Sequence, residues 1–232
     1  MVEVQTTGGV GAGLTLTNII FDDAGKKEGT VFAQAVSDGS VGAASNDNLV
    51  YVQDAIIASN ATVTTTITLG DGAVLRNFGG MSAVRATGEA KLVMEPGSVI
   101  EDASSITRSK GDAGSVGPAG AVWLQGSDFE MENGAEIKNV NGRAVYADGG
   151  SVSVGGTISG IIGNPAMWQG KDGTAIHLRG SAKATLNGKI SDCTEGVLVF
   201  VDKAVFEMAT GSFLGNSDAA GIKTNEDPTW SL

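Results

Sequence analysis

A degenerate repeat is the feature that most constrains how this chain of 232 residues can fold. Each unit has two apolar residues two positions apart, a glycine-bearing turn, an apolar anchor residue and a second turn. The units are TITLGDGAVLRNF (66–78), KLVMEPGSVIEDA (91–103), DFEMENGAEIKNV (128–140), SVSVGGTISGI (151–161), KATLNGKISDC (183–193) and VFEMATGSFLGNS (205–217). The units at 151–161 and 183–193 are shorter at the first turn. Units this short bury their apolar side only by stacking, so the repeat predicts a solenoid.

Each unit continues into a second segment with strand character. These segments are SAVRATG (82–88), GAVWLQG (120–126), RAVYADGG (143–150), GTAIHLRG (173–180), GVLVFVD (196–202) and AGIKTNE (220–226). Successive units are 22 to 25 residues apart where nothing intervenes, and 32 or 37 apart where an insertion does. The insertions are residues 104–119 and 163–173, which we expect to form surface loops.

Stacking the units produces three apolar columns. The first strands contribute alternate residues such as Leu92 and Met94, which lie on one side of a strand. The anchors are Leu75, Ile100, Ile137, Ile158, Ile190 and Leu214. The second strands add Val84, Val122, Val145, Ile176, Leu198 and Ile222. This pattern predicts an all-β fold, a right-handed single-stranded parallel β-helix with three short strands and about 22 residues per bare coil.

The sequence indicates a single β-helix domain over residues 1–232. We expect it to divide into N-terminal coils with a short capping helix (1–60), regular coils (61–225) and a C-terminal tail or cap (226–232). The segment GLTLTNIIFDD (13–23) is typical of another strand and turn. The segment NLVYVQDAIIASN (48–60) is typical of the capping helix.

Composition narrows the classes of partner. The formal net charge is −11, which disfavours nucleic acids and anionic membrane surfaces because phosphate binding needs clustered Lys and Arg. The sequence has no continuous apolar run of about 18 residues, so we expect no membrane insertion. Thirty-five glycines with four prolines indicate many tight turns. The single cysteine excludes an internal disulfide.

Three stretches of the sequence resemble a known family. LVMEPGSVIEDAS, FEMENGAEIKNVN with its continuation to Gly150, and ATLNGKISDCTEG are similar to the right-handed parallel β-helix repeats of bacterial and archaeal cell-surface, adhesin-like proteins, which belong to the pectate-lyase-like superfamily. The resemblance covers roughly residues 61–225. It implies an extracellular or cell-surface location, as a fragment of a larger secreted protein. The matching residues belong to the core and the turns, so the resemblance speaks for fold more than for function.

Carboxylates are the first candidates for catalysis or calcium binding. Asp102 and Asp192 fall two residues after an anchor, where other units have an asparagine such as Asn139. Asn and Asp tolerate the left-handed conformation, so this position predicts a column of turns. Glu95, Glu130, Glu132 and Glu207 point outward near the first strands. We interpret them as an exposed acidic face, with a calcium or catalytic site as the alternative.

The remaining residue types give no catalytic or metal set. One histidine and one cysteine provide no zinc-binding spacing, so we expect no metal and no cofactor. Cys193 follows the anchor Ile190 at a position where other units have apolar residues, which predicts a buried small side chain rather than a nucleophile. His177 has no aligned carboxylate and is a poor general base.

The outward positions of the second strands form the candidate binding site. In successive coils we expect these to be Arg85, Trp123, Tyr146, His177, Val199 and Lys223. Neighbouring strands stack about 4.8 Å apart, so Trp123, Tyr146 and His177 should form what we call the aromatic strip. The insertions could cover it, with Trp168 packed on Tyr146 or His177. The alternative is an open strip that recognises sugar rings or an extended peptide, because aromatic side chains beside arginine are typical binding hot spots.

Two classes of function follow. The first is a non-catalytic, adhesin-like module of the cell surface that binds a host or microbial glycan or protein ligand, acts as a stiff spacer, or does both. Its candidate ligand-binding residues are Trp123, Tyr146, His177, Arg85 and Trp168. The alternative is a polysaccharide lyase or glycoside hydrolase acting on an acidic or host glycan. A third hypothesis is a structural protein that stacks end to end through exposed strand edges.

Overall fold

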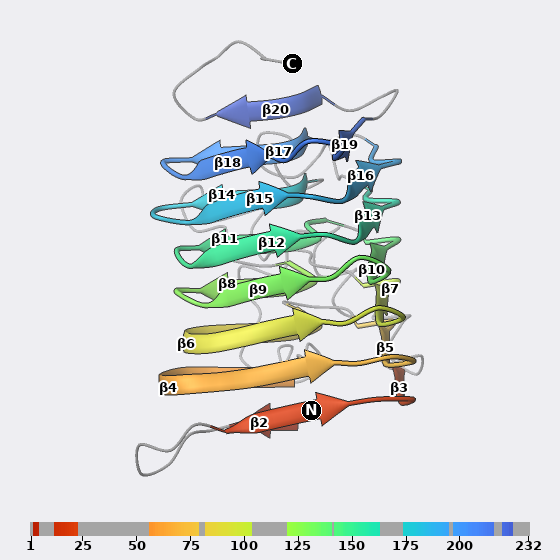
Figure 1. Cartoon of the computed structure of the whole chain (residues 1–232), viewed down its shortest axis with the longest axis vertical. Coiled ribbons are helices and arrows are strands. Elements are labelled where there is room, and N and C mark those ends of the chain that lie inside the picture. The colour runs from red at the N-terminus through yellow and green to blue at the C-terminus, as the bar shows by residue number, and fades with distance from the viewer. Residues whose placement is uncertain are drawn as a thin grey trace, which may run out of the picture.

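The computed structural model describes residues 2–4, 12–22, 56–78, 82–103, 120–140, 142–162, 174–194, 197–215 and 220–224. Every regular element in these ranges is a β-strand, and every strand pairing between them is parallel. The predicted all-β class with parallel sheets is therefore confirmed. Figure 1 shows the strands piled from β2 at one end to β20 at the other.

The strands fall into three columns. The first-strand column contains β2 (Gly13–Leu16), the C-terminal parts of β4 (Ile56–Leu69) and β6 (Val84–Met94), β9 (Asp128–Met131), β12 (Ser151–Val154), β15 (Lys183–Leu186) and β18 (Val205–Met208). The anchor column contains β3 (Ile20–Asp22), β5 (Val74–Arg76), β7 (Val99–Glu101), β10 (Glu136–Lys138), β13 (Thr157–Ser159), β16 (Lys189–Ser191) and β19 (Phe213–Leu214). The second-strand column contains β1 (Val2–Val4), the N-terminal parts of β4 and β6, β8 (Val122–Gln125), β11 (Val145–Asp148), β14 (Thr174–Arg179), β17 (Val197–Asp202) and β20 (Ala220–Thr224).

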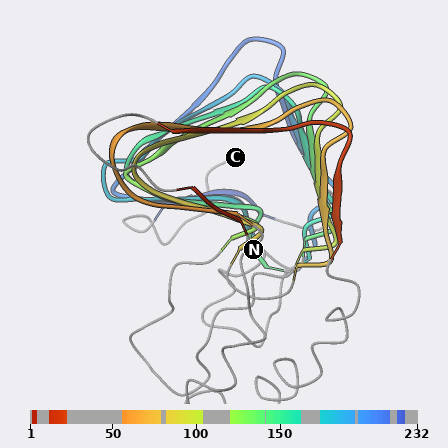
Figure 2. The same cartoon turned by 90° about the horizontal axis from the view of Figure 1, so that it is seen from below.

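Two sheets connect these columns. The anchor strands form a 7-stranded sheet, and the other two columns form one 13-stranded sheet. The second sheet is continuous because β4 and β6 run from the second strand of one coil into the first strand of the next. Thus the start of β6 pairs with β8 and its end pairs with β9. Viewed along the stack, the coils superpose as similar elongated outlines (Figure 2).

The predicted registers of the first-strand and anchor columns are confirmed. Ile137 pairs with Ile100 on one side and Ile158 on the other, and Ile158 pairs with Ile190. All four side chains are fully buried in one continuous apolar core. The first strands stack in the same way: Leu92 with Phe129, Phe129 with Val152, Val152 with Ala184 and Ala184 with Phe206. The segment 13–23 also follows the prediction, because its strands β2 and β3 lie on β4 and β5.

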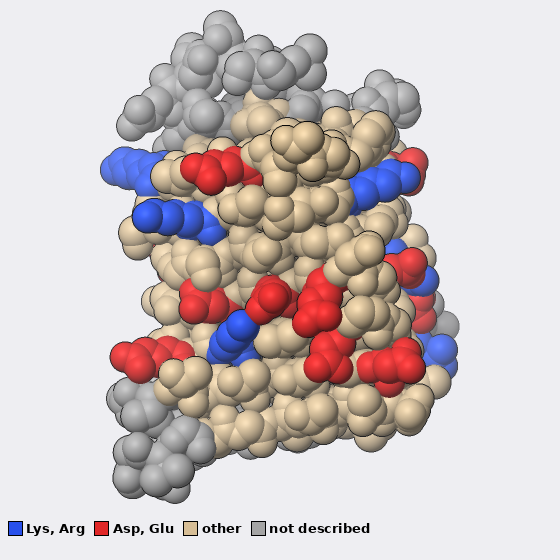
Figure 3. All heavy atoms as spheres, in the orientation of Figure 1, with Lys and Arg blue, Asp and Glu red and all other residues tan. Residues whose placement is uncertain are grey.

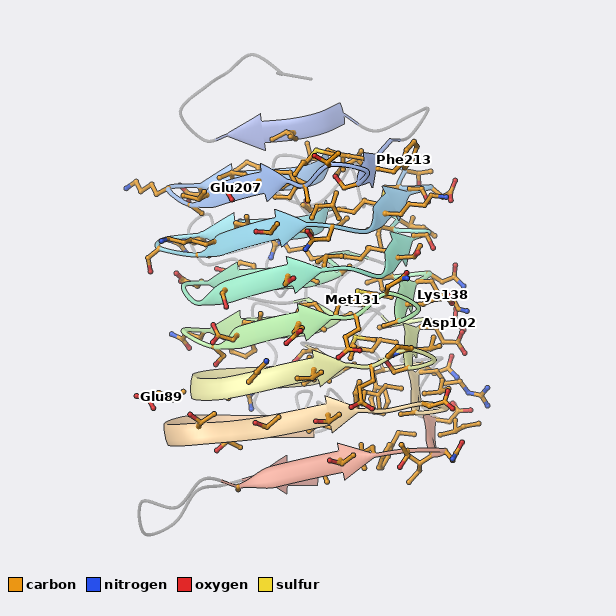
Figure 4. The ribbon with its side chains drawn as sticks, in the orientation of Figure 1. Glu89, Asp102, Met131, Lys138, Glu207 and Phe213 are labelled. Carbon is orange, nitrogen blue, oxygen red and sulfur yellow. The ribbon has the colours of Figure 1, made fainter. Side chains whose placement is uncertain are left out.

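The turn column is confirmed where the structure describes it. Asn77, Asp102, Asn139 and Asp192 have φ between 52° and 63°, and Gly160 occupies the same position with φ 63°. This left-handed backbone favours glycine, asparagine and aspartate. Figure 4 shows Asp102 beside the anchor column, away from the core. The carboxylates of this column are therefore explained by backbone conformation.

The predicted capping helix is wrong over residues 56–60, which begin strand β4. Ile56 pairs with Val84 on one side and Val2 on the other, and its side chain is fully buried. Pairing on both edges and burial of a β-branched side chain outweigh the local preference for helix. Residues 48–55 of that prediction lie outside the described part of the chain, as do the insertions 104–119 and 163–173 and the tail 226–232.

Candidate functional site

The aromatic strip exists with the predicted register. Trp123 pairs with Tyr146, and Tyr146 pairs with His177, on the neighbouring strands β8, β11 and β14. The centroids of the Tyr146 and His177 rings are 5.0 Å apart. Their strand neighbours Val145 and Ile176 are fully buried in the core, so the rings project from the opposite face of the sheet.

The prediction for the fifth position of this column is wrong. Phe200, rather than Val199, lies beside His177, with ring centroids 4.8 Å apart in an edge-on arrangement. Val199 pairs with Ile176, so Val199 takes the inward position predicted for Leu198. Strand β17 is apolar and buried from Val197 to Val201, so it has no alternation that fixes its face.

A signal in the sequence could have identified Phe200. Gly196 precedes Val199 by the same number of residues as Gly173 precedes Ile176. Aligning these two glycines places Phe200 opposite His177. We call Trp123, Tyr146, His177 and Phe200 the aromatic ladder.

Burial decides how the ladder can act. The exposed fractions are 8% for Trp123, 4% for Tyr146, 7% for His177 and 2% for Phe200. Rings this deeply buried have no open face on which a sugar ring or a peptide can stack. Of the two predicted roles, the burial favours cover. The ligand-binding role of Trp123, Tyr146, His177 and Arg85 stays a prediction, and Trp168 lies outside the described residues.

Cations accompany the rings. The Arg85 guanidinium carbon lies 5.1 Å from the centroid of the Trp123 ring, and that of Arg143 lies 5.5 Å from the Tyr146 ring. Both distances fall within the range of cation–π attraction. Arg143 is only 2% exposed and was not anticipated, because it precedes β11 and follows no strand alternation. The indole Nε1 of Trp123 is buried and has no hydrogen-bond partner among the described residues.

A charged column borders the ladder. Gln125, Asp148, Arg179 and Asp202 pair in that order along β8, β11, β14 and β17. Arg179 Nε lies 3.7 Å from an Asp202 oxygen. The pKa of Arg179 is raised above its ordinary value, chiefly by a side-chain hydrogen bond with Tyr146. Because Arg179 is more than half exposed, this bond fixes its orientation and adds little stability.

The outward glutamates form an acidic face. Figure 3 shows Asp and Glu side chains over the N-terminal half of the first-strand column. Glu130 is paired with Lys91 at 2.6 Å, and both side chains are well exposed. No group of three or more His, Cys, Asp or Glu side chains within the described ranges is placed to hold a metal ion. The arrangement therefore matches the expected exposed face.

Cys193 is a buried core residue, as predicted. Its side chain is fully buried, and burial raises the pKa of its thiol from 9.0 to about 12. The thiolate is the nucleophilic form, so Cys193 is inert at neutral pH. It stacks in the core with the equivalent residues Val140 and Ile161, which are also fully buried.

Comparisons with known proteins give no relative. No protein-family model, no curated protein and no solved structure matches this chain. The resemblance to adhesin-like β-helix repeats therefore stays a prediction. Over the described residues, no helix is long and apolar enough to cross a membrane.

Proposed function

We propose that this chain is a non-catalytic, adhesin-like module of a cell-surface protein, which acts as a stiff scaffold and presents loops that bind a glycan or protein ligand. In this proposal the scaffold is a right-handed single-stranded parallel β-helix with three strands and about 22 residues per bare coil. Its location is extracellular, as part of a larger secreted protein.

The unbroken register of the stack is the observation that carries the proposal. Equivalent residues pair from β3 through β5, β7, β10, β13 and β16 to β19 without a shift. Each coil is therefore hydrogen-bonded and packed to the coils on either side. A solenoid built this way resists bending between repeats, which is what a spacer requires.

The positions of the interruptions support loop presentation. The segments 23–55, 104–119 and 163–173 all connect an anchor strand to a second strand, between β3 and β4, β7 and β8, and β13 and β14. Their ends therefore leave and rejoin the scaffold at the same corner of the coil. The aromatic ladder lies on the strands that follow this corner, where burial of four large side chains stabilises the adjoining edge.

Ligand binding by loop variants tests the proposal. The full chain would be screened on a glycan array and against extracellular matrix proteins. In two variants, 104–119 or 163–173 would be replaced by a short Gly/Ser turn. We expect at least one replacement to weaken binding tenfold or more while the circular dichroism spectrum is retained. The control is Ser153→Ala, on the outer face of β12, which should bind normally.

The same material decides the alternative. Release of reducing or unsaturated sugars from pectin, alginate or host glycans by the purified chain would identify a polysaccharide lyase or glycoside hydrolase and overturn the proposal. Unchanged binding in both loop variants would place the ligand site elsewhere on the scaffold and would contradict loop presentation.

A further inference from the structure

A recess of about 420 Å³ indents the corner between the first-strand and anchor columns. It spans the coils that contain β12–β13 and β15–β16. Its lining is Asn133, Gly155, Gly156, Thr157, Asn187, Gly188, Lys189, Gly211 and Phe213. The volume lies within the range of about 300–1,000 Å³ typical of small-molecule sites.

Two shortened turns create the recess. Gly155 and Gly156 alone connect β12 to β13, and Asn187 and Gly188 alone connect β15 to β16. The coils on either side have longer turns at this corner, Glu132–Ala135 and Ala209–Ser212, which project past the shortened pair. The corner therefore recedes over two coils and is walled by longer turns at both ends.

Close stacking keeps these turns free of side chains. Gly188 N donates to Val154 O at 2.8 Å, and Gly155 N donates to Met131 O at 2.6 Å. A Cβ atom on Gly156 would collide with the backbone oxygen of Ala135, and one on Gly188 would collide with that of Gly156. The backbone of one coil thus excludes a side chain from the next, and the recess stays open.

The recess combines one aromatic face with several polar groups. Thr157, Lys189 and Phe213 occupy one outward column, because Thr157 pairs with Lys189 and Lys189 with Phe213. Phe213 is 52% exposed and lies near the C-terminal end of the anchor column (Figure 4). The amides of Asn133 and Asn187 face the same space from the turns. A single apolar face with a few convergent hydrogen-bonding groups is typical of a ligand site.

We propose that this recess binds one neutral pyranose residue of a glycan. The apolar face of the sugar would lie on the Phe213 ring, whose negative π face attracts C–H groups that carry partial positive charge. The Asn133 and Asn187 amides and the Thr157 hydroxyl would hydrogen-bond the sugar hydroxyls. This proposal rests on the proposed function in taking the ligand to be a glycan, and it names a site separate from the loops.

Charge favours a neutral sugar over an acidic one. The exposed carboxylate of Glu132 adjoins Asn133, and the acidic face continues from there. The one lining cation, Lys189, holds its ammonium 5.6 Å from the centroid of the Phe213 ring. A uronate would gain this single cation but approach several carboxylates, whereas a neutral ring meets no like charge.

Saturation-transfer NMR on the full chain tests the site. The probes are the methyl glycosides of glucose, galactose, mannose and N-acetylglucosamine, with methyl glucuronide as the acidic comparison. We expect transfer to the ring protons of at least one neutral glycoside, reduced at least fivefold by Phe213→Ala and by Asn187→Ala. Thr157→Arg, which fills the recess from a strand position, should have the same effect.

Ile162→Ala is the matched control, because Ile162 is also 52% exposed and lies away from the recess lining. It should leave the transfer unchanged. Equal transfer in wild type and Phe213→Ala, preference for the glucuronide, or no transfer from any neutral probe would overturn the recess proposal. Loop-dependent binding on the array would still support the proposed function, so the two proposals can fail separately.

Discussion

Single side chains shape the corners of each coil. At the second turn the backbone must adopt positive φ, and the chain places asparagine, aspartate or glycine there, as at Asn139, Gly160 and Asp192. For other residues this conformation costs about 1–2 kcal/mol. Polar residues with catalytic potential thus recur in this chain for conformational reasons.

At the same scale, Tyr146 distinguishes cover from ligand recognition. Tyr146→Ala should lower the free energy of unfolding by about 3–5 kcal/mol, because it removes a large buried ring. Tyr146→Phe keeps the ring and loses only the hydrogen bond with the exposed Arg179, so it should cost about 1 kcal/mol or less. Urea unfolding monitored by circular dichroism measures both values. A stable Tyr146→Ala variant that has lost glycan binding would instead support the open strip.

Strands and turns are held in place by the coil beneath them. Where alternation is clear, as in β9 with Phe129 and Met131 buried, the sequence predicts the register. Where a long run is apolar, as in β17, only pairing with β14 decides which side faces the core. The short turns likewise depend on their neighbours, because Gly156 and Gly188 each meet the backbone of the preceding coil.

Gly188→Ala tests this dependence between turns. The added Cβ would collide with a backbone oxygen that cannot move without shifting a coil, so we expect a loss of about 3 kcal/mol or more in unfolding free energy. Gly126→Ala is the control: its φ is 70°, but nothing lies within 4 Å of the added atom. It should cost about 1–2 kcal/mol from backbone strain alone. Equal losses, measured by urea denaturation, would mean that the turns are not in contact.

The whole molecule behaves as a one-dimensional stack. Each coil contacts mainly its two neighbours, and the core is a continuous apolar column from Ile56 to Val201. In such an array, stability is set by interfaces between adjacent repeats. Among the described strands, β10 has partners on both edges and β19 on one.

Hydrogen exchange should therefore be graded along the stack. We expect amides of β10 and β13 to exchange at least tenfold more slowly than those of β19, because opening an end coil breaks one interface and opening a central coil breaks two. Peptide-resolved exchange with mass spectrometry measures this. Uniform protection from end to end would show that the stack opens only as a unit.

The sequence determined the stacking units, the three columns and the turn positions, because short apolar repeats have only one way to bury their surface. It predicted that Trp123, Tyr146 and His177 would align, since alternation on β8, β11 and β14 is fixed by adjacent core residues. The tertiary structure decided the partner of His177, the strand at residues 56–60 and the burial of the aromatic ladder. It also revealed the recess, which depends on how far two shortened turns recede behind their neighbours. These features arise from contacts between coils, and such contacts are not encoded within any one repeat.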